Sequence, residues 1–155
     1  MDRYDRRLLR ALQTDASVGN ALLGESIGLS ASQVSRRRAR LEADGFITGY
    51  HAKLSPVALG YELNVFIRIR LQAHSEDAAN DFRVFVQALP AIRLACAITG
   101  DADYLLHAQL PDLHALSVLI NTELLAHTLV REVRSDVVLE MIKDDASIPV
   151  DNNVR

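Results

Sequence analysis

Apolar positions near the start of the chain recur with the spacing of a single helix face. The side chains that share this face are those of Tyr4, Leu8, Ala11 and Leu12. Several arginines fall between them, on the sides that water can solvate. The pattern therefore predicts a first amphipathic helix that turns its apolar face toward the rest of the N-terminal part.

A second and a third helix follow, separated by a short turn. Residues 20–27 make the second helix, which is expected to end at Gly28 because glycine suits the left-handed turn that closes many helices. Ser30 and Gln33 then have the spacing of a capping box, in which each side chain binds a free backbone N–H at the start of a helix. Two helices joined by a three-residue turn that contains glycine are typical of a helix-turn-helix.

The third helix has an apolar side, with Val34 and Leu41, and an opposite side that is polar and cationic. Short polar groups near a helix N-terminus can reach base edges in the major groove, and arginines can bind guanine or phosphate. Runs of arginine alone are usually solvated surface, so it is the capped turn before this helix that favours DNA binding. The predicted DNA-contacting residues are Ser30, Ser32, Gln33, Arg36, Arg37 and Arg40. Among them, base edges are expected for Ser32, Gln33 and Arg36, and phosphates for Arg37 and Arg40.

A wing is expected after this helix. Gly45 closes the helix, with Phe46 as the apolar contact beyond it, and residues 46–54 have the pattern of a small β-hairpin. Residues 55–62, which contain a proline and a glycine, then form a linker. Residues 1–54 are thus predicted to be a winged helix-turn-helix domain.

The rest of the chain predicts strands and helices in the order β-α-β-β-α-β. The strands are expected over residues 63–71, 92–99, 104–110 and 129–142, and the helices after Ser75 and after Pro111-Asp112. Right-handed crossovers then give a four-stranded antiparallel sheet with both helices on one face, a ferredoxin-like domain over residues 63–145. Residues 146–155 are expected to form a C-terminal tail. The predicted fold class is α+β.

One face of this predicted sheet has no covering element in the chain. The face carries either Phe66 or the residues that alternate with it along the strand. A second subunit is the obvious cover for such a face, so we expect a homodimer at least.

The two parts of the chain differ in charge. Residues 1–55 have a formal net charge of +3 and residues 56–155 one of −6, which favours an anionic partner such as DNA for the N-terminal part. The single cysteine, Cys96, cannot form an intramolecular disulfide, and no apolar run approaches the roughly 20 residues that span a membrane. The sequence has no zinc-ligand spacing, phosphate-binding loop or nucleophile elbow. We therefore expect a cytoplasmic protein that is not an enzyme and needs no metal or cofactor.

Four blocks of sequence together resemble the Lrp/AsnC family, the feast/famine transcription regulators. They are residues 23–30, residues 36–42, the glycine-phenylalanine-isoleucine run at 45–47 with Tyr50, and the Gly-Asp-Ala-Asp-Tyr run at residues 100–104. The resemblance implies a ferredoxin-like effector domain of the RAM type, related to ACT domains, that dimerises and assembles further into octamers. It also implies that a small effector, usually an amino acid, binds between subunits near residues 100–104.

The expected effector site consists of Thr99, Gly100, Asp101, Asp103, Tyr104 and Ser135. Loop N–H groups can receive a carboxylate, and Asp101 or Asp103 can receive an ammonium group. Thr99 and Ser135 are expected to add polar side chains from neighbouring strands. An ordinary hairpin turn is the alternative, because glycine and aspartate favour turns in any case.

The expected function is sequence-specific transcription regulation in response to an amino acid or a related metabolite. An architectural DNA-packaging protein with little sequence preference is the alternative, because such proteins depend mainly on phosphate contacts.

Three residues depart from the family pattern. Gly24 stands where the family usually has alanine, and glycine within a helix is expected to cost about 1 kcal/mol. Arg38 replaces a β-branched apolar residue, so its stem is expected to pack inward while its guanidinium reaches solvent. Ala102 stands where larger residues are common and is expected to enlarge the effector pocket.

Overall fold

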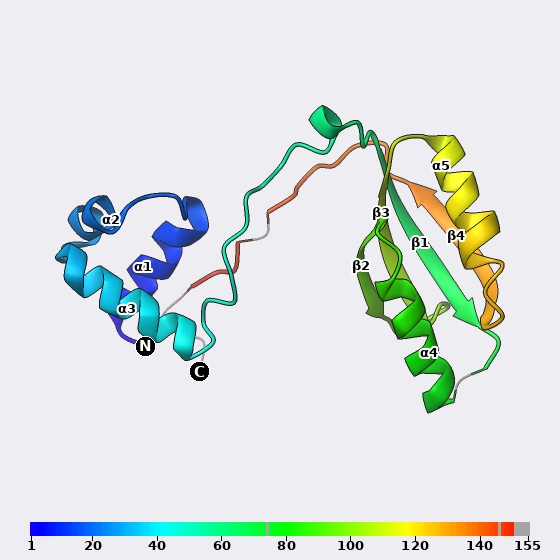
Figure 1. Cartoon of the computed structure of the whole chain (residues 1–155), viewed down its shortest axis with the longest axis horizontal. Coiled ribbons are helices and arrows are strands. Elements are labelled where there is room, and N and C mark those ends of the chain that lie inside the picture. Colours follow the sequence, from blue (N-terminus) through cyan, green and yellow to red (C-terminus); the bar gives the residue numbers. More distant parts are fainter. Residues whose placement is uncertain (74, 146, 151–155) are drawn as a thin grey trace. The chain divides into compact units, whose positions relative to one another are not determined.

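The N-terminal helices begin and end where their capping residues predict. A computed structural model, which describes residues 1–73, 75–145 and 147–150, contains helices α1 (Arg3–Thr14), α2 (Asn20–Ile27) and α3 (Ala31–Ala43) in this part (Figure 1). The predicted capping box between Ser30 and Gln33 is confirmed. Gly28 closes α2 in the left-handed conformation, with a φ of 78°, as expected.

The three helices enclose a small apolar core. Its buried side chains are Leu8, Leu12, Leu23, Ile27, Val34 and Leu41. The inward faces predicted from helical spacing are therefore confirmed except at Tyr4, whose ring is half-buried outside this core and contacts Arg3 and Arg37. The core also holds a carboxylate, because Asp5 on α1 has only 1% of its surface exposed. Sequence spacing did not predict this buried charge.

The predicted wing hairpin is wrong, because residues 46–54 run extended after α3 without forming paired strands. An isolated two-stranded hairpin is marginal unless a hydrophobic face packs on something, and this segment leaves side chains such as Leu54 exposed. Phe46 is also not the expected apolar contact. It is 54% exposed, and Ile47 packs against the helical core in its place.

The end of the chain returns to the N-terminal helices. Gln13 on α1 binds both backbone polar groups of Ile148, because its Nε2 donates to the carbonyl at 3.0 Å and its Oε1 accepts from the N–H at 2.6 Å. Lys53 forms a salt bridge with Asp144 at 2.9 Å. The chain accordingly divides into one unit of residues 1–53 with the residues from 143 onward, and another of residues 54–142. Residue 146 and residues 151–155 of the expected tail lie outside the described residues.

The second unit has the predicted ferredoxin-like topology. Its four-stranded antiparallel sheet has the strand order β2-β3-β1-β4. The strands are β1 (Leu63–Leu71), β2 (Ile92–Ala97), β3 (Tyr104–Leu110) and β4 (Val130–Val137). The helices are α4 (Glu76–Gln87) and α5 (Leu113–Val118), which the π-helical turn η2 (Leu119–Leu124) continues, and a short 3-10 helix, η1 (Val57–Leu59), precedes the sheet. Ser75 and Asp112 cap α4 and α5, as the sequence predicts.

Both helices pack on one face of this sheet (Figure 1). Alternate residues of β1 are buried beneath them; these are Val65, Ile67, Ile69 and Leu71. The opposite face, which carries Phe66, is covered by no helix of the described chain. The expectation of an uncovered sheet face is therefore confirmed.

The predicted ends of two strands in this unit are wrong, because β2 ends at Ala97 and β4 at Val137, before residues 99 and 142. The Val138 N–H still donates to the Asn64 carbonyl at 2.9 Å, but β1 begins at Leu63 and offers no partner for the rest of the predicted strand. Leu139, which continues the alternating pattern, is 98% exposed. In the second helix, the wider π turn buries Leu119, and the neighbouring Ile120 packs against the same core while partly exposed.

Candidate nucleic-acid interface and effector site

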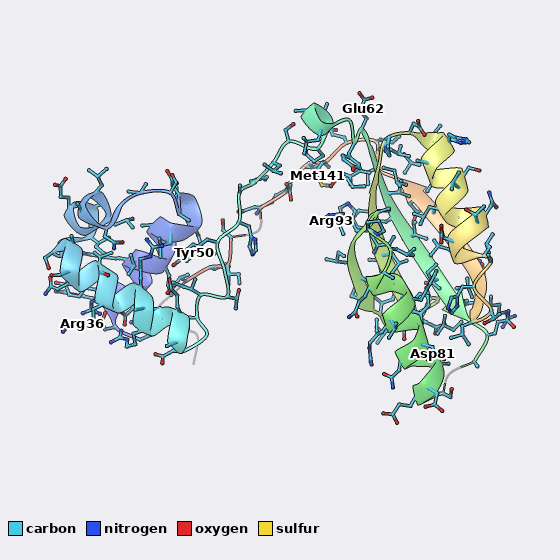
Figure 2. All side chains as sticks on the ribbon, viewed as in Figure 1. Arg36, Tyr50, Glu62, Asp81, Arg93 and Met141 are labelled. Carbon is cyan, nitrogen blue, oxygen red and sulfur yellow. The ribbon has the colours of Figure 1, made fainter. Side chains whose placement is uncertain are left out.

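The polar side of α3 is open to solvent. The side chains of Ser30, Ser32, Gln33, Arg36 and Arg40 are exposed, as the helical wheel predicts. Figure 2 shows Arg36 on the outer side of α3. These residues lie on the first three turns of a helix whose opposite side is fixed in the core by Val34 and Leu41.

The capping box uses part of the polar chemistry at the start of α3. Ser30 Oγ accepts from the backbone N–H of Gln33 at 3.3 Å, and Gln33 Oε1 accepts from the backbone N–H of Ser30 at 2.9 Å. The carboxamide oxygen of Gln33 is therefore engaged within the protein. A base contact by Gln33 would therefore use its NH2 group, which can donate to an acceptor on a base edge.

The two arginines predicted at phosphates both bind carboxylates of helix α1. Arg37 Nη1 lies 2.7 Å from Asp2 Oδ2 and 2.7 Å from Asp5 Oδ1, and Arg40 Nη2 lies 2.7 Å from Asp5 Oδ2. Their exposure differs, since the Arg37 side chain is 19% exposed and that of Arg40 is 51% exposed. Arg37 is thus part of an ion-pair cluster between α1 and α3, whereas Arg40 keeps one side open to a ligand.

Hydrogen bonds keep the carboxylates of this cluster ionised. The backbone N–H of Asp5 and then the guanidinium of Arg37 lower the pKa of Asp2 to about 2. Burial raises the pKa of Asp5, but the backbone N–H of Asp2 and the Arg37 guanidinium outweigh burial and lower it below the ordinary value. Hydrogen bonds to the charged form favour that form.

Arg38 is half-buried, and its guanidinium is held by side chains of two neighbouring segments. The guanidinium lies 4.8 Å from the centre of the Tyr50 ring and donates to Asn20 Oδ1 at 3.2 Å. The Tyr50 hydroxyl in turn donates to Glu42 at 2.7 Å. Arg38 therefore links the start of α2 to the extended segment after α3, where Figure 2 labels Tyr50.

The loop between β2 and β3 is held to the sheet by its own backbone and side chains. Gly100 has a φ of 117°, which a residue with a Cβ rarely adopts. Asp103 Oδ2 accepts from the backbone N–H of Leu71 at 2.7 Å, where the pairing of β1 and β4 shifts register. The Tyr104 ring packs against Phe82, with 4.6 Å between ring centres. Asp103 and Tyr104 therefore both have structural roles, whatever they contact in a complex.

A hollow of about 230 Å³ lies beside this loop. Its lining residues are Arg70, Leu71, Gly100, Asp101, Ala102, Asp103 and Arg131. Asp101 carries a carboxylate and the two arginines carry positive charge, so the hollow has groups of both signs. Sequence spacing missed Arg70 and Arg131, because they reach the loop only through the strand order. Ala102 lines the hollow but is itself only 7% exposed.

The structure does not bring Thr99 and Ser135 to neighbouring strands, so this expectation is wrong. Thr99 lies two residues after the end of β2, and Ser135 lies in β4 opposite Ile67. β2 and β4 are the two edges of the sheet, with β3 and β1 between them. Thr99 remains next to the loop, whereas Ser135 is not among the residues that line the hollow beside it.

A cluster of metal ligands and a membrane-spanning helix are both absent from the described part of the chain. No group of three or more histidine, cysteine, aspartate or glutamate side chains there is placed to hold a metal ion. Within the same residues, no helix has the length and apolar character needed to cross a membrane.

A helix-turn-helix with an exposed polar third helix, followed by a ferredoxin-like unit with a charged hollow at one loop, defines a two-domain, ligand-responsive DNA-binding protein. Residues 1–42 match the AsnC-type helix-turn-helix domain, and residues 64–148 match the Lrp/AsnC ligand binding domain. The leucine-responsive regulatory protein of Escherichia coli K12 is 38% identical over 143 residues, which cover 92% of this chain and 87% of that protein.

Solved structures show the same relationship. A transcriptional regulator of Neisseria meningitidis, in a complex with L-Met, is 35% identical with a TM-score of 0.93 and 97% coverage of both chains. An AsnC family transcriptional regulator of Agrobacterium tumefaciens is 33% identical with a TM-score of 0.93, covering 99% of this chain and 100% of the other. The chain belongs to the Lrp/AsnC family of transcription regulators.

Proposed function

We propose that this regulator reads a specific operator with the first turns of α3. The observation that carries the proposal is the exposed face of Ser32, Gln33 and Arg36 on a helix anchored in the core by its opposite side. Short polar side chains and an arginine are the groups that distinguish base pairs in the major groove. In this arrangement Arg40 binds a phosphate, while Arg37 stays with its carboxylates.

The second part of the proposal concerns the effector. An amino acid or a close relative binds in the hollow beside the Gly100–Tyr104 loop, with its ammonium group at Asp101 and its carboxylate toward Arg70 or Arg131. Opposite charges on one small hollow suit a zwitterion of this size. The L-Met bound to the Neisseria regulator supports this class of ligand.

The uncovered face of the sheet is the proposed site of assembly. The uncovered sheet face has Phe66 stacked on His107, with 5.0 Å between ring centres, and Leu94 half exposed nearby. A second copy of the chain covers this face in a homodimer, and dimers assemble further to an octamer. The assembled protein binds double-stranded DNA in the cytoplasm, and it acts by binding, without catalysis or a cofactor.

The DNA-binding proposal is tested by comparing Arg36→Ala with Arg40→Ala on an operator selected from random-sequence duplexes. Arg36→Ala is expected to weaken operator binding by about 1 to 3 kcal/mol and to relax sequence preference. Arg40→Ala is expected to weaken binding to all DNA and to reduce the salt slope by about one. Affinities measured over a range of salt concentrations separate the two effects.

Two outcomes would contradict this proposal. Identical sequence profiles and salt slopes for the two variants would exclude the division between base and phosphate contacts. If the wild-type protein binds the selected operator no better than random duplex, it is an architectural DNA-packaging protein instead.

A further inference from the structure

We propose that Asp5 is a positioning residue for DNA recognition, which acts from α1 by orienting the guanidinium of Arg40 on α3. The inference rests on the proposed use of α3 for DNA binding. It assigns a role in recognition to a buried carboxylate that lies on a different helix from the predicted DNA contacts.

The Asp5 carboxylate is bonded at both oxygens and can hardly move. Oδ1 lies 2.7 Å from Arg37, and Oδ2 lies 2.7 Å from Arg40 and accepts from the backbone N–H of Asp2 at 2.8 Å. The side chain is 1% exposed, so water competes little for these bonds. Asp5 is therefore a fixed point to which both arginines of α3 are tied.

Arg40 is the arginine whose orientation, fixed by Asp5, can favour a contact with DNA. A guanidinium has five N–H donors in a rigid plane. The Nη2 of Arg40 donates to Asp5 Oδ2. Half of the side chain is exposed, so the remaining donors can bind a phosphate. Because the guanidinium is already ordered, binding DNA costs less rotamer freedom than it would for a free arginine.

Arg37 binds the same Asp5 carboxylate as Arg40, but its guanidinium has no side open to a ligand. It lies between Asp2 and Asp5 at 2.7 Å from each, its guanidinium carbon is 5.5 Å from the centre of the Tyr4 ring, and little of it reaches solvent. It therefore fixes α3 against α1 and does not itself reach a ligand.

Fastening two helices does not by itself require these charges. Burying ions costs solvation free energy, and apolar side chains of similar volume often join helices equally well or better. What the ionic cluster provides in addition is a defined orientation for a cation on the recognition helix.

The test is a double-mutant cycle on the full-length protein, with affinities for the selected operator and for random duplex DNA over a range of salt concentrations. The variants are Asp5→Asn, Arg40→Ala and both together. Asp2→Asn is the matched control, because it removes a carboxylate from the same cluster, keeps a capping oxygen for α1 and does not touch Arg40.

In the wild-type background we expect Arg40→Ala to weaken operator binding about tenfold. In the Asp5→Asn background the further effect of Arg40→Ala is expected to fall to about twofold, because Arg40 is no longer held in place. In the Asp2→Asn background it should stay near the wild-type value. A purely structural role of Asp5 would lower the melting temperature but leave this factor unchanged.

An equal effect of Arg40→Ala with and without Asp5 would overturn the proposal. If Asp5→Asn does not fold, Arg40→Lys decides, because lysine keeps the charge but lacks the planar fork. Binding by Arg40→Lys as weak as by Arg40→Ala supports positioning, and full recovery overturns it. If neither Arg36→Ala nor Arg40→Ala changes DNA binding, the proposed use of α3 fails, and this inference with it.

Discussion

Gly24 is a buried residue of α2 that lies against the turn leading to α3. Helix propensity alone predicts that this glycine weakens α2. In the structure, a Cβ at this position would lie 2.4 Å from the backbone oxygen of Leu29. The Leu29 N–H also donates to the Gly24 carbonyl at 2.8 Å, so the turn after α2 folds tightly back over the helix. The close approach of the turn, and not the helix, explains the glycine.

We therefore predict that Gly24→Ala destabilises the protein by roughly 1 to 3 kcal/mol, as inserted atoms do in a packed site. Propensity alone predicts a gain of about 1 kcal/mol. Urea denaturation followed by circular dichroism measures the difference. Gly19→Ala is the control, since a Cβ there meets nothing within 4 Å. Because Gly19 is the N-cap of α2, where alanine is less favourable than glycine, a loss of roughly 0.5 kcal/mol is expected for it. A Gly24→Ala protein at least as stable as the wild type would show that the turn can shift aside.

At the scale of single residues, sequence reasoning succeeded where the partner is a chain neighbour. Ser30 and Gln33 are three positions apart, and their capping box was predicted correctly. Asp5 is bonded to residues 32 and 35 positions away, and its burial was not predictable from a helical wheel. The expected effector residues divide in the same way, because the positive φ of Gly100 is local whereas the position of Ser135 depends on the strand order.

At the scale of elements, alternation and helical spacing located most segments but did not fix all of their ends. The strands at Leu63–Leu71 and Tyr104–Leu110 have the predicted ranges. The first alternates strictly, and the second follows the turn that begins at Gly100. β4 stops close to where its partner β1 begins, and residues 46–54 form no paired strands. In each of these cases the deciding contact is with another element, and a pattern within one segment cannot report it.

The junction of α1 and α3 predicts how the N-terminal unit responds to acid. The folded-state pKa values of Asp2, about 2, and of Asp5 lie below their ordinary values. The unfolded chain therefore binds more protons as the pH falls, and the stabilisation present at neutral pH is lost between roughly pH 5 and pH 2. Asp15 and Asp145, whose pKa values are also lowered, add to the same trend.

Comparison of wild type with Asp2→Asn measures how much the Asp2 carboxyl contributes to acid sensitivity. The free energy of unfolding, measured with urea at a series of pH values, should fall less steeply for the variant below about pH 5, because one depressed carboxyl has been removed. Asp2→Asn keeps a side-chain oxygen at the helix cap, so loss of the cap does not confuse the result. Parallel pH profiles for the two proteins would mean that Asp2 does not contribute to acid sensitivity.

At the scale of the whole molecule, the two units are joined by more than the linker that follows the N-terminal helices. The chain leaves the first unit after Lys53 and re-enters it at Lys143, where Asp144, Ile148 and Val150 bond to that unit. Two covalent connections therefore run between the effector unit and the DNA-binding unit. Sequence patterns predicted only a tail here, because isolated bonds between this segment and side chains far away in the sequence leave no periodic signal.

We expect the effector to change DNA binding by changing how the subunits assemble. A ligand bound between subunits can favour one assembly, and hence one spacing of the two recognition helices, only by its difference in affinity for the two states, typically about 1 to 3 kcal/mol. Asp101→Ala is a cleaner test than Asp103→Ala, because the Asp103 carboxylate binds the Leu71 backbone. Asp81→Ala, which removes an exposed carboxylate on α4, is the matched control (Figure 2).

We expect that at least one amino acid raises the melting temperature of the wild type, as a ligand of the native state does, and changes both light scattering and operator affinity. Asp101→Ala should keep its basal stability and basal DNA affinity but lose all three responses, whereas Asp81→Ala should keep them. A two-fold dimer should also protect two half-sites about one helical turn, or a multiple of it, apart in a footprint. If Asp101→Ala responds as the wild type does, or if no amino acid changes assembly or DNA binding at millimolar concentration, residues 100–104 form only a hairpin turn.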